Sequence, residues 1–115
     1  MTPWLLAFTL TLLSETPVVL AFLSASEPVR WRLAFLVLYA NLATHPLVWF
    51  AFPQVLQLPG RWWLGPAEAY AVLAEAAFYQ ALLRPGWRRA AAASLCANGA
   101  SFVLGLALHA MVGWP

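Results

Sequence analysis

Two polar motifs, each set within an apolar run, contain the side chains of this chain that are best placed to do chemistry. The first motif holds Asn41 and Thr44, and the second holds Asn98 and Ser101 with the same spacing. Residues three apart lie on one face of a helix, so the amide and the hydroxyl of each motif can together hold a carboxyl group. An arginine lies nine residues before each asparagine, with a tryptophan just ahead of it. This recurrence indicates a duplicated unit.

A glutamate upstream of each motif supplies the carboxyl group that the motif can hold. Glu15 precedes Asn41 and Glu75 precedes Asn98, both within apolar runs. A charged residue within a membrane costs about 2.5–3.5 kcal/mol on insertion scales, and such residues usually face the bundle interior. We therefore expect an ion- or substrate-binding site at mid-membrane. Its predicted members are Glu15, Glu75, Asn41, Thr44, His45, Asn98 and Ser101.

Two further titratable residues, Glu68 and His109, are expected near the outer face of the membrane. There they would line an outer vestibule that leads to the central site, with apolar packing closing the opposite side. Each residue also has a simpler interpretation. A carboxylate at the start of a helix and a histidine near its end both complement the helix dipole.

No cofactor is predicted, although the carboxylates are compatible with a bound cation. If a metal ion is bound, its ligands would come from His45, Glu15 and Glu75. The sequence contains no close His or Cys spacing that would support a metal site, and the identity of such a metal is left open.

A stripe of small and polar residues marks one face of the last apolar run. Ser94, Asn98, Ser101, Gly105 and His109 follow one another at spacings of three or four residues. This pattern is typical of a packing seam between membrane helices. It also fits the polar lining of a binding site.

Prolines distinguish the first unit from the second. Pro17 and Pro46 follow the polar residues of the first unit, where a proline within a helix frees a backbone carbonyl. Ala77 and Val103 occupy the matching positions of the second unit. The two halves of the predicted site are therefore expected to be unequal.

The composition predicts that the chain lies in lipid rather than in water. Of its 115 residues, 63% are apolar and 9% are charged, whereas soluble domains carry about 25% charged residues. A soluble domain of this size could not bury so much apolar surface. The formal net charge of +2, without a basic face, argues against nucleic-acid binding. A single cysteine, Cys96, excludes an intramolecular disulfide, and its apolar context predicts a buried thiol.

Four apolar runs are long enough to cross a bilayer, which takes about 20 helical residues. They extend over residues 3–23, 33–52, 67–83 and 90–112. The predicted fold is an all-α integral membrane protein, whose four transmembrane helices form two tandem, parallel-repeat helical hairpins in a compact bundle. We expect one membrane domain over 1–115, with repeat unit 1 at about 3–52 and repeat unit 2 at about 67–112. The proline and glycine residues of the connector, 53–66, predict turns there.

The placement of the arginines predicts the orientation of these hairpins. Five arginines lie in or beside the two short turns within the hairpins, and only Arg61 lies in the connector. The positive-inside rule then places both turns in the cytoplasm and both termini on the non-cytoplasmic side. The tryptophans are expected at the same boundaries, with Trp31 and Trp87 on the cytoplasmic side and Trp4, Trp49, Trp62, Trp63 and Trp114 on the other.

We interpret the chain as a small multi-pass transporter or channel subunit that binds a proton, a cation or a small cationic solute at mid-membrane. An alternative is a non-catalytic membrane subunit or assembly factor, whose buried polar residues specify helix pairing and partners. A weaker alternative is an intramembrane enzyme acting on a lipid-soluble substrate. The sequence lacks a nucleophile elbow and a phosphate-binding glycine loop, so an enzyme is less favoured. Four short spans enclose little volume, which predicts a homodimer or larger assembly in the bilayer.

Overall fold

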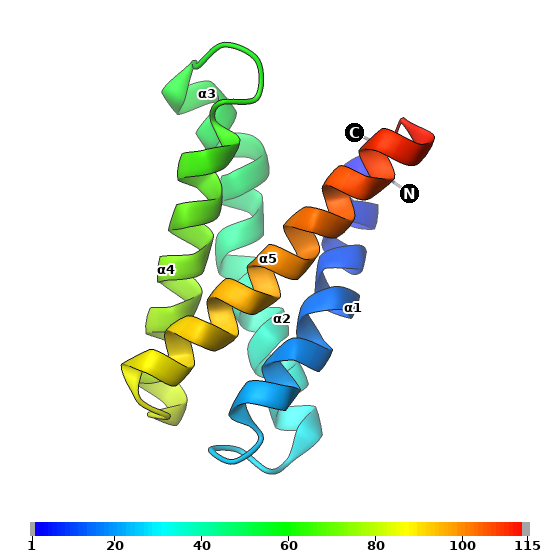
Figure 1. Cartoon of the computed structure of the whole chain (residues 1–115). Coiled ribbons are helices and arrows are strands. Elements are labelled where there is room, and N and C mark those ends of the chain that lie inside the picture. The colour runs from blue at the N-terminus through cyan, green and yellow to red at the C-terminus, as the bar shows by residue number, and fades with distance from the viewer. Residues whose placement is uncertain (1, 114–115) are drawn as a thin grey trace.

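Helices make up almost all of the protein in a computed structural model that describes residues 2–113 (Figure 1). The elements are α1 (Pro3–Leu23), α2 (Arg30–Pro46), a π-helical segment (Leu47–Ala51), α3 (Phe52–Leu56), α4 (Leu64–Leu83) and α5 (Trp87–Val112). The π-helical segment joins α2 to α3 without a break, so residues 2–113 form four helical rods. No strand occurs within residues 2–113. The predicted all-helical class is confirmed.

The helices extend further into the connector than the sequence predicts. Turns are expected over 53–66, but only residues 57–63 lie between α3 and α4. Pro53 is the second residue of α3, within the continuous rod. Pro66 lies in the first turn of α4, where a missing backbone N–H leaves no helical hydrogen bond unmade. Gln57 ends α3 in a left-handed conformation, with φ of 50°. The prediction of turns is therefore wrong at both ends of the connector.

Three of the four rods are long and apolar enough to cross a membrane. They are α1, the continuous rod Arg30–Leu56, and α5. The sequence predicts four apolar spans, but the mean hydropathy of α4 is lower than that of the three other rods. Its 20 residues include Glu68, Glu75 and Gln80, which lower its mean hydropathy.

The rods form a ring in the order α1, α2, α4, α5, so α1 lies diagonally opposite α4, and α2 lies opposite α5. The two short turns, residues 24–29 and 84–86, lie at one end of the bundle, which we call the arginine end (Figure 1). The connector, the beginning of α1 and the end of α5 lie at the opposite end, which we call the connector end. In Figure 1, α1 and α5 diverge from α2 and α4 toward the connector end.

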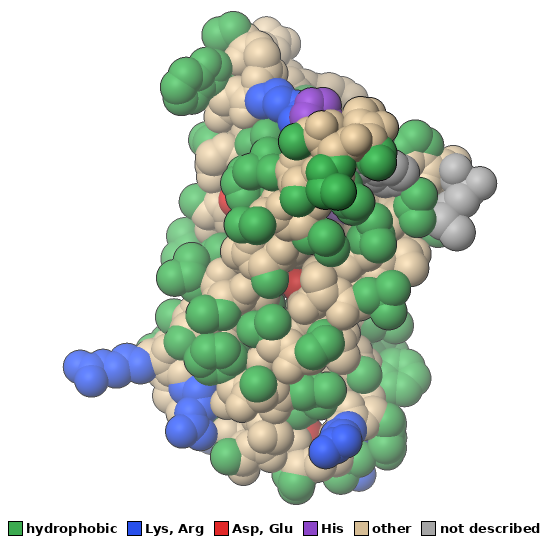
Figure 2. Space-filling model, turned by 45° about the vertical axis from the view of Figure 1, so that its right-hand side comes forward, with side chains coloured by type: hydrophobic (Ala, Val, Ile, Leu, Met, Phe, Trp, Pro, Cys, Tyr) green, Lys and Arg blue, Asp and Glu red, His purple; other side chains and the backbone are tan. Residues whose placement is uncertain are grey.

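The bundle buries polar side chains and exposes large apolar ones. Leu13, Leu73 and Val103 are 67%, 71% and 63% exposed, whereas the exposed fractions of Glu15 and Glu75 are 0% and 1%. Apolar side chains are spread along the length of the face in Figure 2, and most of the basic side chains gather at its arginine end. Water-soluble proteins show the opposite arrangement, because buried charges are rare in them.

An apolar plug fills the bundle between the two glutamates and the arginine end. It consists of Val19, Leu23, Leu33, Val37, Ala40, Tyr79, Ala90, Ala93 and Ala97. The three alanines of α5 in this set let the helices approach closely. A smaller apolar cluster of Val48, Ala67 and Ala71 lies toward the connector end. In α2, Asn41 and Thr44 lie between Ala40 of the plug and Val48 of the smaller cluster, and in α4 Glu75 lies between Ala71 and Tyr79.

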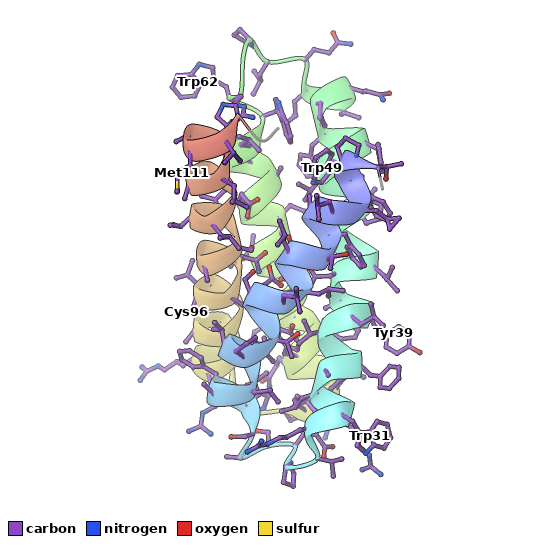
Figure 3. All side chains as sticks on the ribbon, turned by 90° about the vertical axis from the view of Figure 1, so that its right-hand side faces the viewer. Trp31, Tyr39, Trp49, Trp62, Cys96 and Met111 are labelled. Atoms are coloured by element: carbon purple, nitrogen blue, oxygen red, sulfur yellow. The ribbon has the colours of Figure 1, made fainter. Side chains whose placement is uncertain are left out.

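Cys96 lies on the exposed face of α5, and this corrects the prediction of a buried thiol. Its side chain points away from the bundle (Figure 3), next to the exposed Leu95. The buried residues that follow are Ala97 and Asn98. An apolar run whose outer face is also apolar does not reveal which residues are buried, and the sequence prediction failed for this reason.

Candidate functional site

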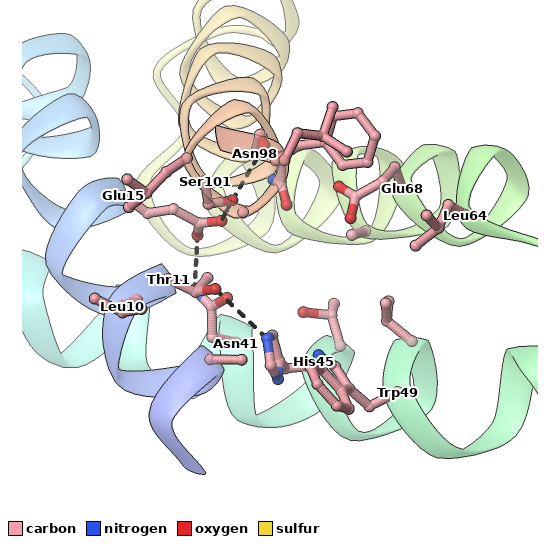
Figure 4. Close-up of a pocket in the computed structure, with 18 of the residues that line it drawn as sticks. Leu10, Thr11, Glu15, Asn41, His45, Trp49, Leu64, Glu68, Asn98 and Ser101 are labelled. Atoms are coloured by element: carbon pink, nitrogen blue, oxygen red, sulfur yellow. Dashed lines mark hydrogen bonds between the residues drawn. The ribbon is translucent and has the colours of Figure 1, made fainter. Parts of the chain in front are cut away.

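Glu15 is held by two neutral donors from two other helices. Asn41 Nδ2, from α2, donates to Glu15 Oε2 at 2.9 Å, and Ser101 Oγ, from α5, donates to Glu15 Oε1 at 2.9 Å. Both contacts are visible in Figure 4. The carboxyl group thus binds an asparagine of its own hairpin and a hydroxyl of the other hairpin.

Glu75 has a matching pair of donors. Asn98 Nδ2, from α5, donates to Glu75 Oε2, and Thr44 Oγ1, from α2, donates to Glu75 Oε1 at 3.1 Å. Here too the asparagine comes from the same hairpin as the glutamate, and the hydroxyl comes from the other hairpin. The two sites are therefore equivalent: in each, the carboxyl group binds one asparagine and one hydroxyl, and the contributions of the two hairpins are reversed.

The donors are themselves anchored to the backbone of their helices. Asn41 also donates to the carbonyl of Val37 at 3.0 Å, and Asn98 donates to the carbonyl of Ser94 at 2.9 Å. Thr44 likewise contacts the carbonyl one turn back, at 3.1 Å. Each donor therefore has a fixed direction before any ligand arrives, which is the arrangement that a preorganised site requires.

A cavity of about 420 Å³ reaches from Glu15 toward the connector end. Thr11, Glu15, Asn41, His45, Asn98 and Ser101 are among the polar residues of its inner part, and Arg61, Glu68 and His109 lie nearer its outer part. Leu10, Val48, Trp49, Trp63, Leu64 and Phe102 supply much of its apolar wall. Glu15, Ser101 and Glu68 all face this cavity in Figure 4. Pockets of this size, with a few convergent polar groups, are typical of small-molecule sites.

Glu75 does not line this cavity, although its side chain belongs to the same hydrogen-bond network. Ser101 and Asn98 join the two glutamates, because Ser101 Oγ also lies 3.0 Å from the carbonyl of Asn98. The sequence predicts one pocket that both carboxyl groups face. The structure instead joins both carboxyl groups in one hydrogen-bond network, and of the two only Glu15 lines the cavity.

His45 lies in the wall of the cavity, surrounded by aromatic rings. Its Nε2 is 3.5 Å from Thr11 Oγ1, and its Nδ1 has no hydrogen-bond partner within residues 2–113. The ring of Phe8 lies 5.3 Å away, centroid to centroid, and those of Trp4 and Trp49 both lie at 6.1 Å. The π-helical segment begins directly after Pro46. Such segments are frequent at functional sites.

The stripe on α5 divides into two parts. Ser94 is buried and donates from Oγ to the carbonyl of Val72 in α4 at 2.7 Å, so it forms a packing seam. The other members of the stripe all line the cavity: Asn98, Ser101, Gly105 and His109. The packing-seam interpretation therefore applies to Ser94, and the rest of the stripe forms part of the cavity lining.

Sequence reasoning missed several residues of the cavity wall. Thr11 precedes Glu15 by one helical turn, a spacing that could have identified it. Trp49, Trp63 and Arg61 were expected only as boundary or connector residues. Their approach to the cavity depends on how α1 and α5 diverge from the other rods, which no local pattern encodes.

Within the described residues, no group of three or more His, Cys, Asp or Glu side chains is arranged to hold a metal ion. His45, Glu15 and Glu75, the ligands considered from the sequence, therefore do not come together as such a group. No family model, curated protein or solved structure matches this chain.

Proposed function

We propose that this chain is a small integral membrane protein, a transporter or channel subunit, that binds a proton or a small cationic solute at a site built around Glu15 and Glu75. The observation that carries the proposal is a pair of matching carboxyl sites, buried at the centre of an apolar bundle. Buried ionisable groups within membrane helices usually mark the path of an ion or a substrate.

The hydrogen-bond inventory of the two sites supports proton binding. Ser101 Oγ lies near two acceptors, Glu15 Oε1 and the carbonyl of Asn98, but a hydroxyl has only one hydrogen to donate. Thr44 Oγ1 is in the same position, between Glu75 Oε1 and the carbonyl one turn back. A proton on each carboxyl group supplies the second hydrogen, because the acid then donates to the hydroxyl oxygen.

The dimensions and the exposed surface of the bundle support placement across a bilayer. Its longest extent is 41 Å, and a bilayer measures about 40–45 Å with its headgroups. We propose α4 as the fourth span, because its polar residues Glu75 and Tyr79 face into the bundle. Its 20 residues are as long as a hydrocarbon core requires.

We further propose that the two hairpins are tandem repeats of the same orientation. The exchange of donors between Glu15 and Glu75 supports this arrangement. With the arginine end in the cytoplasm, both termini lie on the non-cytoplasmic side and the cavity opens toward it. Trp31 and Trp62 lie near opposite ends of the bundle in Figure 3, as an aromatic belt at each interface requires. Trp114 lies outside the described residues.

Cys96 provides a test of membrane placement. In intact membranes its thiol should resist a water-soluble maleimide, because an exposed face of α5 at this depth would meet lipid and not water. After denaturation the same thiol should react fully. As a control, Trp62→Cys in a Cys96→Ala background should react in intact membranes, since Trp62 is 76% exposed in the connector. Rapid labelling of Cys96 in intact membranes would contradict the proposal.

Flux through reconstituted vesicles tests the transport function. Proton and monovalent-cation flux should be measured for the unmodified chain, for Glu15→Gln and for Glu75→Gln. An amide cannot exchange a proton, so Glu15→Gln should lose most of the flux, by about tenfold or more. Unchanged flux in both variants, with both shown to be folded, would reject the function proposed for the two glutamates.

A second candidate function is a non-catalytic subunit that assembles with other membrane proteins or with itself. The observation in its favour is that protein groups hold both oxygens of each carboxyl, and that Glu75 lies outside the cavity. In that case the purified protein should carry no flux, and a partner chain should copurify from native membranes. A homodimer or larger assembly is proposed under either function, because four spans enclose little volume.

A further inference from the structure

The two carboxyl sites match in their donors but differ in access, and this difference identifies the one that can meet a ligand. Glu15 lines the cavity of about 420 Å³, whereas Glu75 does not. Thr44 and Asn98, which bind Glu75, both line the cavity. They therefore separate the Glu75 side chain from the cavity. A solute that enters from the connector end therefore reaches Glu15 before Glu75.

Within the described residues, no arginine forms an ion pair with Glu15. Its hydrogen-bond partners, Asn41 and Ser101, are both neutral. A buried carboxylate without a counter-charge is strongly disfavoured, so the group must either hold a proton or face a cation. A ligand with one positive charge would complete the site in place of the proton.

The wall of the cavity indicates what the rest of that ligand must be. Leu10, Val48 and Phe102 contribute apolar surface, and Trp49 and Trp63 contribute indole rings. Indole rings attract cations through their faces and also cover apolar groups. Ca²⁺ and Mg²⁺ require six or more oxygen ligands, which an apolar and aromatic wall does not supply. An organic ammonium ion with an apolar body uses both the carboxylate and the wall.

We propose that the ligand of this cavity is an amphipathic organic amine, with its ammonium group on Glu15 and its apolar body against Trp49, Trp63 and Phe102. This inference rests on the proposed function and specifies its substrate class. Binding is an exchange: the protonated acid of Glu15 releases its proton to the solvent, and the ammonium ion takes its place. No covalent bond forms, and the net charge of the occupied site stays constant.

The other charged groups around the cavity lie farther out or belong to a different site. Arg61, Glu68 and His109 line its outer part, and His45 lies in the wall beside Thr11. Within residues 2–113, Arg61 forms no ion pair with Glu15 or Glu68, so it does not occupy the cation position at Glu15. Glu75 keeps its own donors, Asn98 and Thr44, and acts as a positioning residue for the network.

The test measures ligand binding and proton release together, on the purified chain in weakly buffered detergent solution. The probe is 4-phenylbutylamine, which is protonated at neutral pH, and the matched neutral control is 4-phenylbutanol. Methylammonium, which has no apolar body, is the second control. Binding is followed by the fluorescence of the cavity tryptophans and by calorimetry, and proton release is followed by a pH indicator.

The amine should bind at least about tenfold more tightly than the alcohol or methylammonium, and should release about one proton per molecule bound. Glu15→Gln should lose the proton release and most of the affinity. Cys96→Ala, on the exposed face of α5, should retain both, with affinity within about threefold. If Glu15→Gln is unstable, Gly105→Phe offers a second way to close the cavity and should abolish binding.

Equal binding of the amine and the alcohol would overturn the inference, as would proton release that persists in a folded Glu15→Gln variant. Glu15-dependent flux of protons or inorganic cations without amine binding would overturn the inference and leave the proposed function standing. Absence of both flux and amine binding would overturn the inference and the proposed function together. The two failures are therefore distinguishable.

Discussion

Filling the cavity through Gly105→Phe is expected to reduce flux in reconstituted vesicles by about tenfold or more, because ligand pockets bury most of the surface of their ligand and tolerate little intrusion. Gly105 lines the cavity, and a Cβ at this position would meet no atom within 4 Å. The phenyl ring therefore has room to enter the cavity without displacing the helices. Replacing a glycine within a helix also removes an unfavourable residue. The variant should fold at least as well as the unmodified chain.

Gly99→Phe is the matched control for this experiment. Gly99 lies on the same helix and is also free of atoms within 4 Å of a Cβ, but it faces outward and does not line the cavity. The same substitution there should leave flux within about twofold, as expected for a surface change distant from the site. Equal losses from the two variants, or no loss from Gly105→Phe, would show that the cavity is not the route of the solute.

Asn98→Ala is expected to lower the free energy of unfolding by about 1–2 kcal/mol, measured by denaturant titration in mixed micelles. The amide of Asn98 donates to Glu75 and to the carbonyl of Ser94, so its removal leaves a buried carboxyl group with one donor fewer. The upper part of this range applies because the acceptor is buried, with Glu75 only 1% exposed.

Two controls bracket this result. Asn41→Ala removes the corresponding amide from Glu15 and should cost a similar amount, because its contacts are equivalent. Gly99→Ala, at the neighbouring position, should raise stability by up to about 1 kcal/mol through helix propensity alone. If the losses in unfolding free energy caused by Asn98→Ala and Asn41→Ala differ by more than the cost of one hydrogen bond, the two sites are not energetically equivalent. If neither variant is destabilised, the network has no structural role.

The two expected results address different properties of one network. The donor pairs on Glu15 and Glu75 match, so their contributions to stability should match. The cavity reaches one of them only, so their contributions to function should differ. A duplicated unit in which one copy binds a ligand and the other holds the geometry would account for both properties.

The prolines of the first unit predict unequal halves, and the structure contains one such difference. Pro46 is followed by a π-helical segment that continues as α3, whereas α5 is a regular α-helix throughout. A proline has no N–H to bond to the carbonyl four residues back, so the helix after it can widen. His45 and Trp49, on either side of this change, both line the cavity.

The sequence by itself was sufficient to predict the all-helical class and the use of amides and hydroxyls to hold the carboxyl groups. These are local properties: apolar runs set the helices, and a spacing of three residues aligns Asn41 with Thr44 on one helical face. The sequence predicted that both donors of one motif hold one carboxyl group, and this is wrong, because the structure divides the donors of each motif between Glu15 and Glu75. Even so, local patterns misplaced Cys96, which lies within a run that is apolar on both faces, and they overstated the apolarity of α4. Only the tertiary structure decided which hydroxyl serves which glutamate, and that the cavity reaches Glu15 and not Glu75. Both outcomes depend on where α5 crosses between α1 and α4, a long-range packing arrangement that the spacing of residues along the chain does not encode.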